Sequence, residues 1–147
     1  MVLDSDMLFF KYPDELITWL QNPKHAFALK DPLDSYHYSM GLMEKLTKQP
    51  VTKYINVGAI GLNSPDIDWD AVERWIIELE TTEGSSYLLE QALSAMIISG
   101  NKLQTPNPEN YLVMPDKEQV IVQQGILHHY VDRSKQWYYK IAWRTVK

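Results

Sequence analysis

The chain has 147 residues, 45% of them hydrophobic, and a formal net charge of −5. This composition suits a single globular domain over residues 1–147, and the acidic balance excludes nonspecific nucleic-acid binding, which requires clustered Lys and Arg. The absence of cysteine excludes disulfides and thiolate metal sites and favours a cytoplasmic protein.

The first part of the chain alternates strand and helix patterns. Two apolar runs flank Asp4-Ser5-Asp6 and predict buried strands at 1–3 and 7–10 around an exposed acidic end. A proline followed by two acids predicts a helix over residues 13–22. Its expected apolar face consists of Leu16, Ile17 and Leu20. The pattern then predicts a strand at 25–29 and a loop that passes into a helix at 34–46.

Residues 53–62 are predicted to form a core strand, although this segment carries Asn56 and two glycines where a structural strand prefers bulky residues. We therefore expect another group to approach its backbone closely. Helices are predicted at 68–82, with Asp68 as the N-cap, and at 86–99. The remainder is predicted as a loop with edge strands at 111–114 and 120–122, a final strand at 126–130 and a helix from Ser134.

Asp4 and Asp6 form the first candidate metal-binding motif. In an extended segment, side chains two positions apart lie on the same side, so these carboxylates can converge on one hard cation while Ser5 points away. The alternative is an ordinary turn, because Asp and Ser are common where a strand ends and side chains bond the backbone.

A second candidate group lies near the C-terminus. A histidine at the end of the predicted strand can complete an oxygen-rich metal site, and Lys135, at the start of the following helix, can reach a phosphate beside the same metal. We expect His129 to take this place and His128 to point to the opposite face, with the roles exchanged if the register shifts by one residue. Otherwise these are surface or hydrogen-bonded histidines.

Four segments in order resemble motifs of the GT-A fold glycosyltransferases. The first is Asp-x-Asp-x-x-x-Phe at 4–10, followed by Pro-x-Glu-Leu at 13–16. The segment 55–63 resembles the Asn-x-Gly strand, and 87–93 is similar to the helix that carries an acidic-Gln pair. Residues 129–137 resemble the His-(Tyr/Phe)-x-Gly-x-x-Lys-Pro-Trp signature of glycogenin-like, family 8 retaining enzymes. The sequence departs from the family at Asp132 for Gly, Gln136 for Pro and Glu90 for the usual Asp.

The resemblance implies an α/β, mixed-sheet GT-A fold, represented by its C-terminal part beginning at the Asp-x-Asp strand. The base-binding strands of such enzymes are expected before that strand. The implied activity is metal-dependent transfer of a sugar from a nucleotide-diphosphate sugar to a sugar or lipid acceptor. The residues implied by role are Asp4, Asp6 and His129 for Mn²⁺ or Mg²⁺; Asn56, Gly58 and Lys135 for substrate; and Glu90 and Gln91 for catalysis.

Other functions remain open at this stage. The chain alone is expected to have little or no transferase activity, because half of the donor pocket would be absent from it. The alternative is a noncatalytic remnant that acts as a binding or assembly module. A phosphohydrolase is disfavoured because such enzymes need more carboxylate and His ligands. An unpaired sheet edge would favour a homo-oligomer. Neither a signal-peptide pattern nor a membrane-spanning run is present, and the basic, aromatic residues 134–147 are either a helix docked on the core or a peripheral membrane contact.

Overall fold

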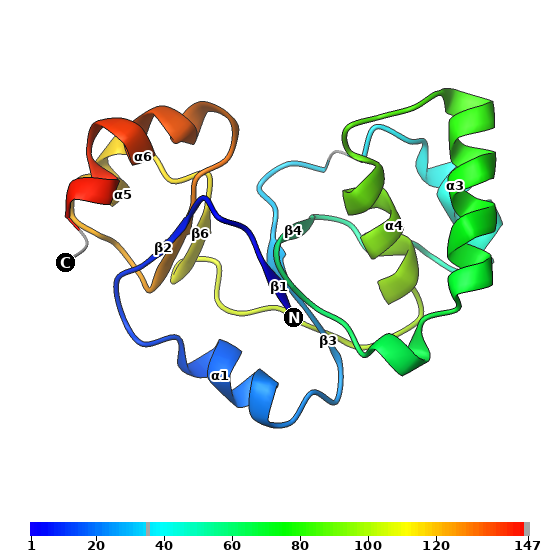
Figure 1. Cartoon of the computed structure of the whole chain (residues 1–147), viewed down its shortest axis with the longest axis horizontal. Helices are drawn as coiled ribbons and strands as arrows, with labels where there is room; N and C mark the ends of the chain where they lie inside the picture. Colours follow the sequence, from blue (N-terminus) through cyan, green and yellow to red (C-terminus); the bar gives the residue numbers. More distant parts are fainter. Residues whose placement is uncertain (35, 146–147) are drawn as a thin grey trace.

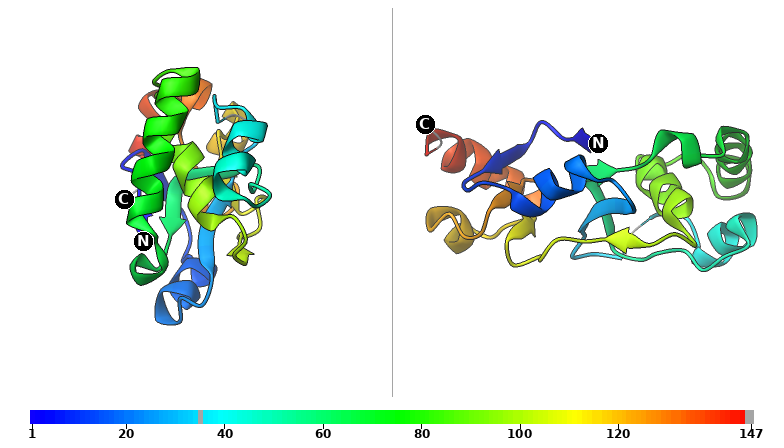
Figure 2. Two further views of the ribbon diagram at one scale, coloured as in Figure 1. Left: turned by 90° about the vertical axis from the view of Figure 1, so that its right-hand side faces the viewer. Right: turned by 90° about the horizontal axis from the view of Figure 1, so that it is seen from below.

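Two small mixed sheets lie next to each other along the molecule, with helices at both ends (Figures 1 and 2). This arrangement is seen in a computed structural model, which describes residues 1–34 and 36–145. The predicted α/β class with mixed strand directions is confirmed. Among the described residues, no helix is both long and apolar enough to cross a membrane.

The larger sheet has four strands in the order β1-β4-β3-β5. Strands β1 and β3 pair antiparallel to β4, and β5 pairs parallel to β3. The strands are β1 (Val2–Leu3), β3 (Ala26–Lys30), β4 (Ile55–Gly61) and β5 (Leu103–Gln104). The helices at this end are α2 (Met40–Thr47), α3 (Trp69–Glu83) and α4 (Leu89–Ile98), with a 3-10 turn η1 (Ser64–Asp66) before α3. Ile55, Leu79 and Met96 share one buried core that joins these helices to β4.

The smaller sheet has the order β2-β7-β6, with β7 antiparallel to β2 and parallel to β6. Its strands are β2 (Met7–Phe9), β6 (Tyr111–Val113) and β7 (Leu127–His129). The helices α5 (Lys117–Ile121) and α6 (Lys135–Lys140) and the 3-10 turns η2 (Asp132–Ser134) and η3 (Ala142–Arg144) complete this end. Val120, Tyr130 and Ala142 form its separate core.

Helix α1 (Asp14–Gln21) helps to join the two sheets. Its buried residues Leu16 and Trp19 share a core cluster with Phe27 of β3 and Leu127 of β7. The predicted face of this helix is correct at Leu16 and wrong at Leu20, which is 47% exposed. Trp19 takes the inward position instead, where its indole N–H donates to the His25 carbonyl at 2.7 Å.

Most predicted elements are found, including Asp68 as the N-cap of α3, where its side chain accepts from the Ala71 N–H. The predicted edge strand at 120–122 is wrong, because a helix runs through it. Asp116 and Gln119 form a reciprocal capping box that starts α5, and this local bonding overrides the strand preference of the β-branched residues.

The first strand also differs from its expected burial. Val2 is 58% exposed and Leu3 is 44% exposed, because β1 lies at the edge of the sheet and neither side chain is covered by other residues. In addition, Ser5 and Asp6 lie in a turn rather than in an extended strand. The chain therefore passes from one sheet to the other at the acidic motif.

Candidate metal site

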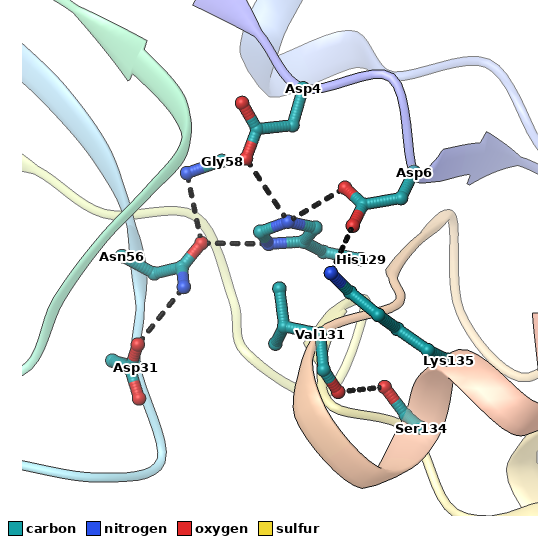
Figure 3. Close-up of polar contacts among 9 residues, drawn as sticks. All are labelled: Asp4, Asp6, Asp31, Asn56, Gly58, His129, Val131, Ser134 and Lys135. Atoms are coloured by element: carbon teal, nitrogen blue, oxygen red, sulfur yellow. Dashed lines mark hydrogen bonds and ion pairs between the residues drawn. The ribbon is translucent and has the colours of Figure 1, made fainter. Parts of the chain in front are cut away.

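The turn from Asp4 to Asp6 connects β1 of the larger sheet with β2 of the smaller sheet. The Asp4 N–H donates to the Gly58 carbonyl of β4 at 2.8 Å, and the Tyr130 N–H donates to the Asp6 carbonyl at 2.9 Å. The backbone of Asp4 is thus held by the larger sheet, and that of Asp6 by the residue that follows β7. The two carboxylates converge as expected, although a turn rather than an extended strand brings them together (Figure 3).

His129 provides the third group of the site. It is the last residue of β7, pairs with Met7 and is only 1% exposed. Its Nε2 atom lies 3.2 Å from Asp6 Oδ1 and 3.4 Å from Asp4 Oδ2. One ligand atom from each of the three residues lies within 4.8 Å of the others. Since hard cations bind such ligands at about 2.0 to 2.6 Å, small side-chain rotations suffice to place all three on one ion.

The His129 ring packs directly against the backbone of Gly58. A Cβ atom at position 58 would overlap the imidazole, with Nε2 at 2.7 Å from it. The expected close approach to this strand is therefore made by a side chain of the same protein. The second glycine of β4, Gly61, has the same relation to the ring of Trp19.

The far side of His129 is hydrogen-bonded to the amide of Asn56, which in turn donates to the carboxylate of Asp31. Its Nδ1 lies 2.8 Å from Asn56 Oδ1, which also accepts from the Gly58 N–H at 3.0 Å. Asn56 Nδ2 donates to Asp31 Oδ2 at 2.9 Å. Asn56 and Asp31 are both buried, at 4% and 8% exposed. Sequence patterns did not indicate Asp31, because its only signal is an acid just after a strand.

The electrostatics favour a neutral imidazole at this position. Burial lowers the pKa of His129 below its ordinary value and outweighs the Asp6 and Asp4 carboxylates, which raise it. Nε2 is buried and has no hydrogen-bond partner within residues 1–34 and 36–145. A neutral ring nitrogen facing two carboxylates leaves a lone pair toward negative charge, an arrangement that a cation between them would stabilise.

A pocket of about 530 Å³ opens beside the site. Asp4, His129 and Lys135 line it together with Glu90 and Gln91 of α4. The structure thus places most of the predicted metal, phosphate and sugar residues around one cavity, while Asp6 lies outside its lining. Asn56 reaches this pocket, whereas Gly58 lies beneath the His129 ring.

Lys135 begins α6 and remains 55% exposed, with Nζ 3.7 Å from Asp6 Oδ2 (Figure 3). Its position depends on the connection after β7, where Ser134 Oγ donates to the Val131 carbonyl at 2.6 Å. His128 points to the other face of β7, as predicted. It packs edge-on against Phe10, with ring centroids 4.7 Å apart, and bonds Gln124 and Tyr130.

Comparisons with protein-family models, curated proteins and solved structures gave no significant match.

Proposed function

We propose that this protein is a metal-dependent glycosyltransferase domain of the GT-A type. Asp4, Asp6 and His129 would hold a divalent cation that binds the diphosphate of a nucleotide sugar. The observation that carries the proposal is the convergence of the buried His129 Nε2 with Asp6 Oδ1 at 3.2 Å and Asp4 Oδ2 at 3.4 Å. A buried nitrogen lone pair that faces two carboxylates is costly unless a cation binds between them.

The donor set limits the choice of metal. Carboxylate oxygens suit Mg²⁺ and Mn²⁺, whereas an imidazole nitrogen is a ligand that transition metals accept more readily. Two carboxylates with one imidazole therefore favour Mn²⁺ over Mg²⁺. The pocket of about 530 Å³ beside these ligands would leave room for a sugar phosphate.

The chain supplies the other groups that sugar transfer requires. When bound, the cation would act as a Lewis acid that stabilises negative charge on the leaving diphosphate. Lys135 would donate to the same phosphate oxygens, since its exposed ammonium is free to turn from Asp6 toward a ligand. Glu90 and Gln91 line the same cavity from α4, where they would bind and orient the donor sugar. No strong base is needed for this chemistry.

At two positions where the sequence departs from the family 8 signature, the backbone would accommodate the signature residue. Asp132, which replaces the signature glycine, has a φ of +48°. Glycine adopts this left-handed conformation readily, and Asp is among the few other residues that tolerate it. Gln136, which replaces the signature proline, lies in the first turn of α6, where proline is accommodated. Both signature residues fit the local structure.

The test is metal-dependent binding of nucleoside diphosphates, measured by calorimetry. UDP, ADP, GDP and CDP are titrated with and without Mn²⁺, with UMP as the single-phosphate control. We expect at least one diphosphate to bind only with Mn²⁺ and more tightly than UMP. Asp6→Asn should abolish this binding. Asp70→Asn is the matched control, because Asp70 is exposed in the first turn of α3.

Binding that is independent of Mn²⁺, or equal in the two variants, would contradict the proposal. If Mn²⁺ bound at the site but none of the nucleoside diphosphates bound with it, the transferase proposal would be wrong and a noncatalytic binding module would be favoured.

A further inference from the structure

We propose that Asn56 and Asp31 are positioning residues for the candidate metal site, which hold His129 in the tautomer that directs the Nε2 lone pair at Asp4 and Asp6. This inference rests on the proposed function, because the cation that binds the lone pair is the one proposed there. It gives Asn56 a role different from the substrate contact that the family resemblance implies.

The orientation of the Asn56 side-chain amide follows from two partners with fixed hydrogen-bonding character. The Gly58 backbone N–H can only donate, so the atom of Asn56 that it meets at 3.0 Å is the oxygen. The Asp31 carboxylate can only accept, so the atom of Asn56 that it meets at 2.9 Å is the nitrogen. Rotating the amide by half a turn would break both hydrogen bonds.

This orientation determines which nitrogen of His129 carries the proton. Asn56 Oδ1 can only accept, and it lies 2.8 Å from His129 Nδ1. Nδ1 must therefore be the donor. In the neutral ring, the second nitrogen, Nε2, then has a lone pair and no hydrogen, which is the form that ligates a metal.

Asp31 is itself held in place. Its Oδ1 accepts from the Leu33 N–H at 2.9 Å, and its own N–H donates to the Tyr54 carbonyl at 2.8 Å. The acid is buried at the end of β3, so the amide of Asn56 has a fixed neighbour rather than mobile water. The hydrogen bonds from Asp31 to Asn56 and from Asn56 to His129 therefore hold the ring of His129 in a fixed orientation against the larger sheet.

His128 provides an internal comparison, because its partners require the opposite tautomer. Its Nε2 lies 2.6 Å from the Gln124 backbone carbonyl, which can only accept, so Nε2 carries the hydrogen. Its Nδ1 then accepts from the Tyr130 hydroxyl at 3.0 Å. Two adjacent histidines of one strand should thus be protonated on different nitrogens.

The test is a long-range ¹H–¹⁵N NMR correlation spectrum of the metal-free, ¹⁵N-histidine-labelled protein at about pH 8, where ordinary imidazoles are neutral. Single substitutions assign the four histidines. We expect the pattern of Nδ1 protonation for His129 and that of Nε2 protonation for His128. This measurement on the wild type requires neither metal binding nor turnover. A wild-type His129 protonated on Nε2 would overturn the inference even if Mn²⁺ bound.

Variants then test the roles of the two residues. Asn56→Leu removes the acceptor, so His129 should shift toward Nε2 protonation and Mn²⁺ should bind roughly 10 to 100-fold more weakly. Asp31→Leu should have the same effect in smaller measure. Asp31→Asn has one acceptor oxygen in place of two, so it can accept from Asn56 Nδ2 or from the Leu33 N–H but not from both, and its effect on the tautomer should be smaller than that of Asp31→Leu.

An unchanged tautomer in folded Asp31→Leu would contradict the role of Asp31. If Asn56→Leu does not fold, the wild-type spectrum and the pair of Asp31 variants still decide. Failure of the proposed function would look different, since it would leave the predicted tautomers intact and remove only Mn²⁺ or diphosphate binding.

Discussion

At the scale of single residues, the site requires a position without a side chain. The His129 ring occupies the space where a Cβ of residue 58 would lie. The glycine therefore fixes how closely β7 approaches β4, and with it the distance from Nε2 to the aspartates.

Gly58→Ala should displace His129 and lower Mn²⁺ affinity at least about tenfold, because a second-sphere disturbance of this kind commonly costs that much. Overpacking should also reduce the free energy of unfolding by about 1 to 3 kcal/mol. Gly41→Ala is the control, since a Cβ at that helical position meets none of the other described residues within 4 Å beyond its chain neighbours and the helix's own backbone. Calorimetric Mn²⁺ titration and urea unfolding measure both effects. Equal metal affinity in the two variants would contradict the packing role of Gly58.

The buried histidines also predict how stability depends on pH. Burial lowers the pKa of both His128 and His129, so the unfolded chain takes up protons before the folded protein does. Stability is then full above the unfolded pKa of about 6.5 and declines as pH falls below it, by at most about 1.4 kcal/mol per pH unit for each histidine. Urea unfolding between pH 5 and about 8 should show this slope, reduced in His128→Gln. Exposed His25→Gln is the control, and an unchanged slope in His128→Gln would contradict the account.

The residues of the site differ in how far sequence could predict them. Asp4 and Asp6 are visible as a local spacing, and His129 as the end of a predicted strand. Asp31 was not predicted because its hydrogen bond joins residues 25 positions apart, and the next contact, from Asn56 to His129, spans 73 positions. A chain of buried polar contacts between strands has no local sequence pattern.

At the scale of elements, the start of α6 presents Lys135 to the site. The 3-10 turn η2 lies between β7 and this helix, and the positive φ of Asp132 gives the change of direction. Lys135 is thus near the carboxylates while its ammonium stays exposed to a ligand.

Lys135→Ala should leave Mn²⁺ affinity nearly unchanged and weaken Mn²⁺-dependent diphosphate binding roughly tenfold to a hundredfold. The reason is that a hydrogen bond to a charged group contributes about 1.5 to 3 kcal/mol. Lys140→Ala removes the same charge from the same helix at a position that contacts Gln136 and Trp137 instead. Calorimetry with each variant provides the comparison. Wild-type diphosphate affinity in Lys135→Ala would show that this lysine only packs at the surface.

Prediction of the elements failed where two local preferences competed. The β-branched run at 120–122 favours a strand, but Asp116 and Gln119 start a helix before it. The strand pattern at β4 and the helical pattern at α3 were strong enough to predict these elements correctly. By contrast, residues 1–9 divide into edge strands of two different sheets, and this division depends on pairing partners that are distant in the sequence. Val2 pairs with Ile60, and Met7 pairs with His129.

At the scale of the whole molecule, the three candidate ligands lie where the two sheets meet. The Asp4 backbone is bonded to β4, and His129 belongs to the smaller sheet. Asp6 lies in the turn between the sheets, where its carbonyl accepts from the N–H of Tyr130, the residue after β7. A cation bound here would join the two sheets in addition to the shared core beneath α1.

Mn²⁺ should therefore raise the melting temperature of the entire chain in one transition. At a concentration of 100 times Kd, binding stabilises the folded state by about 2.7 kcal/mol, which corresponds to roughly 5 to 10 °C for a domain of this size. Calorimetric melting with Mn²⁺ and then with excess chelator tests the shift and its reversal. An unchanged melting temperature in Mn²⁺, or a separate transition for one sheet, would contradict the bridging role.

Asp4, Asp6 and His129 are expected to form one divalent-cation site. Electron paramagnetic resonance measures it most directly, because free Mn²⁺ gives a strong signal that is lost when the ion binds. We expect one tight Mn²⁺ per wild-type chain, loss of that binding in Asp6→Asn and in His129→Gln, and its retention in Asp70→Asn. A titration in which the wild type and both site variants bind Mn²⁺ equally, or in which the wild type binds none, would contradict the claim.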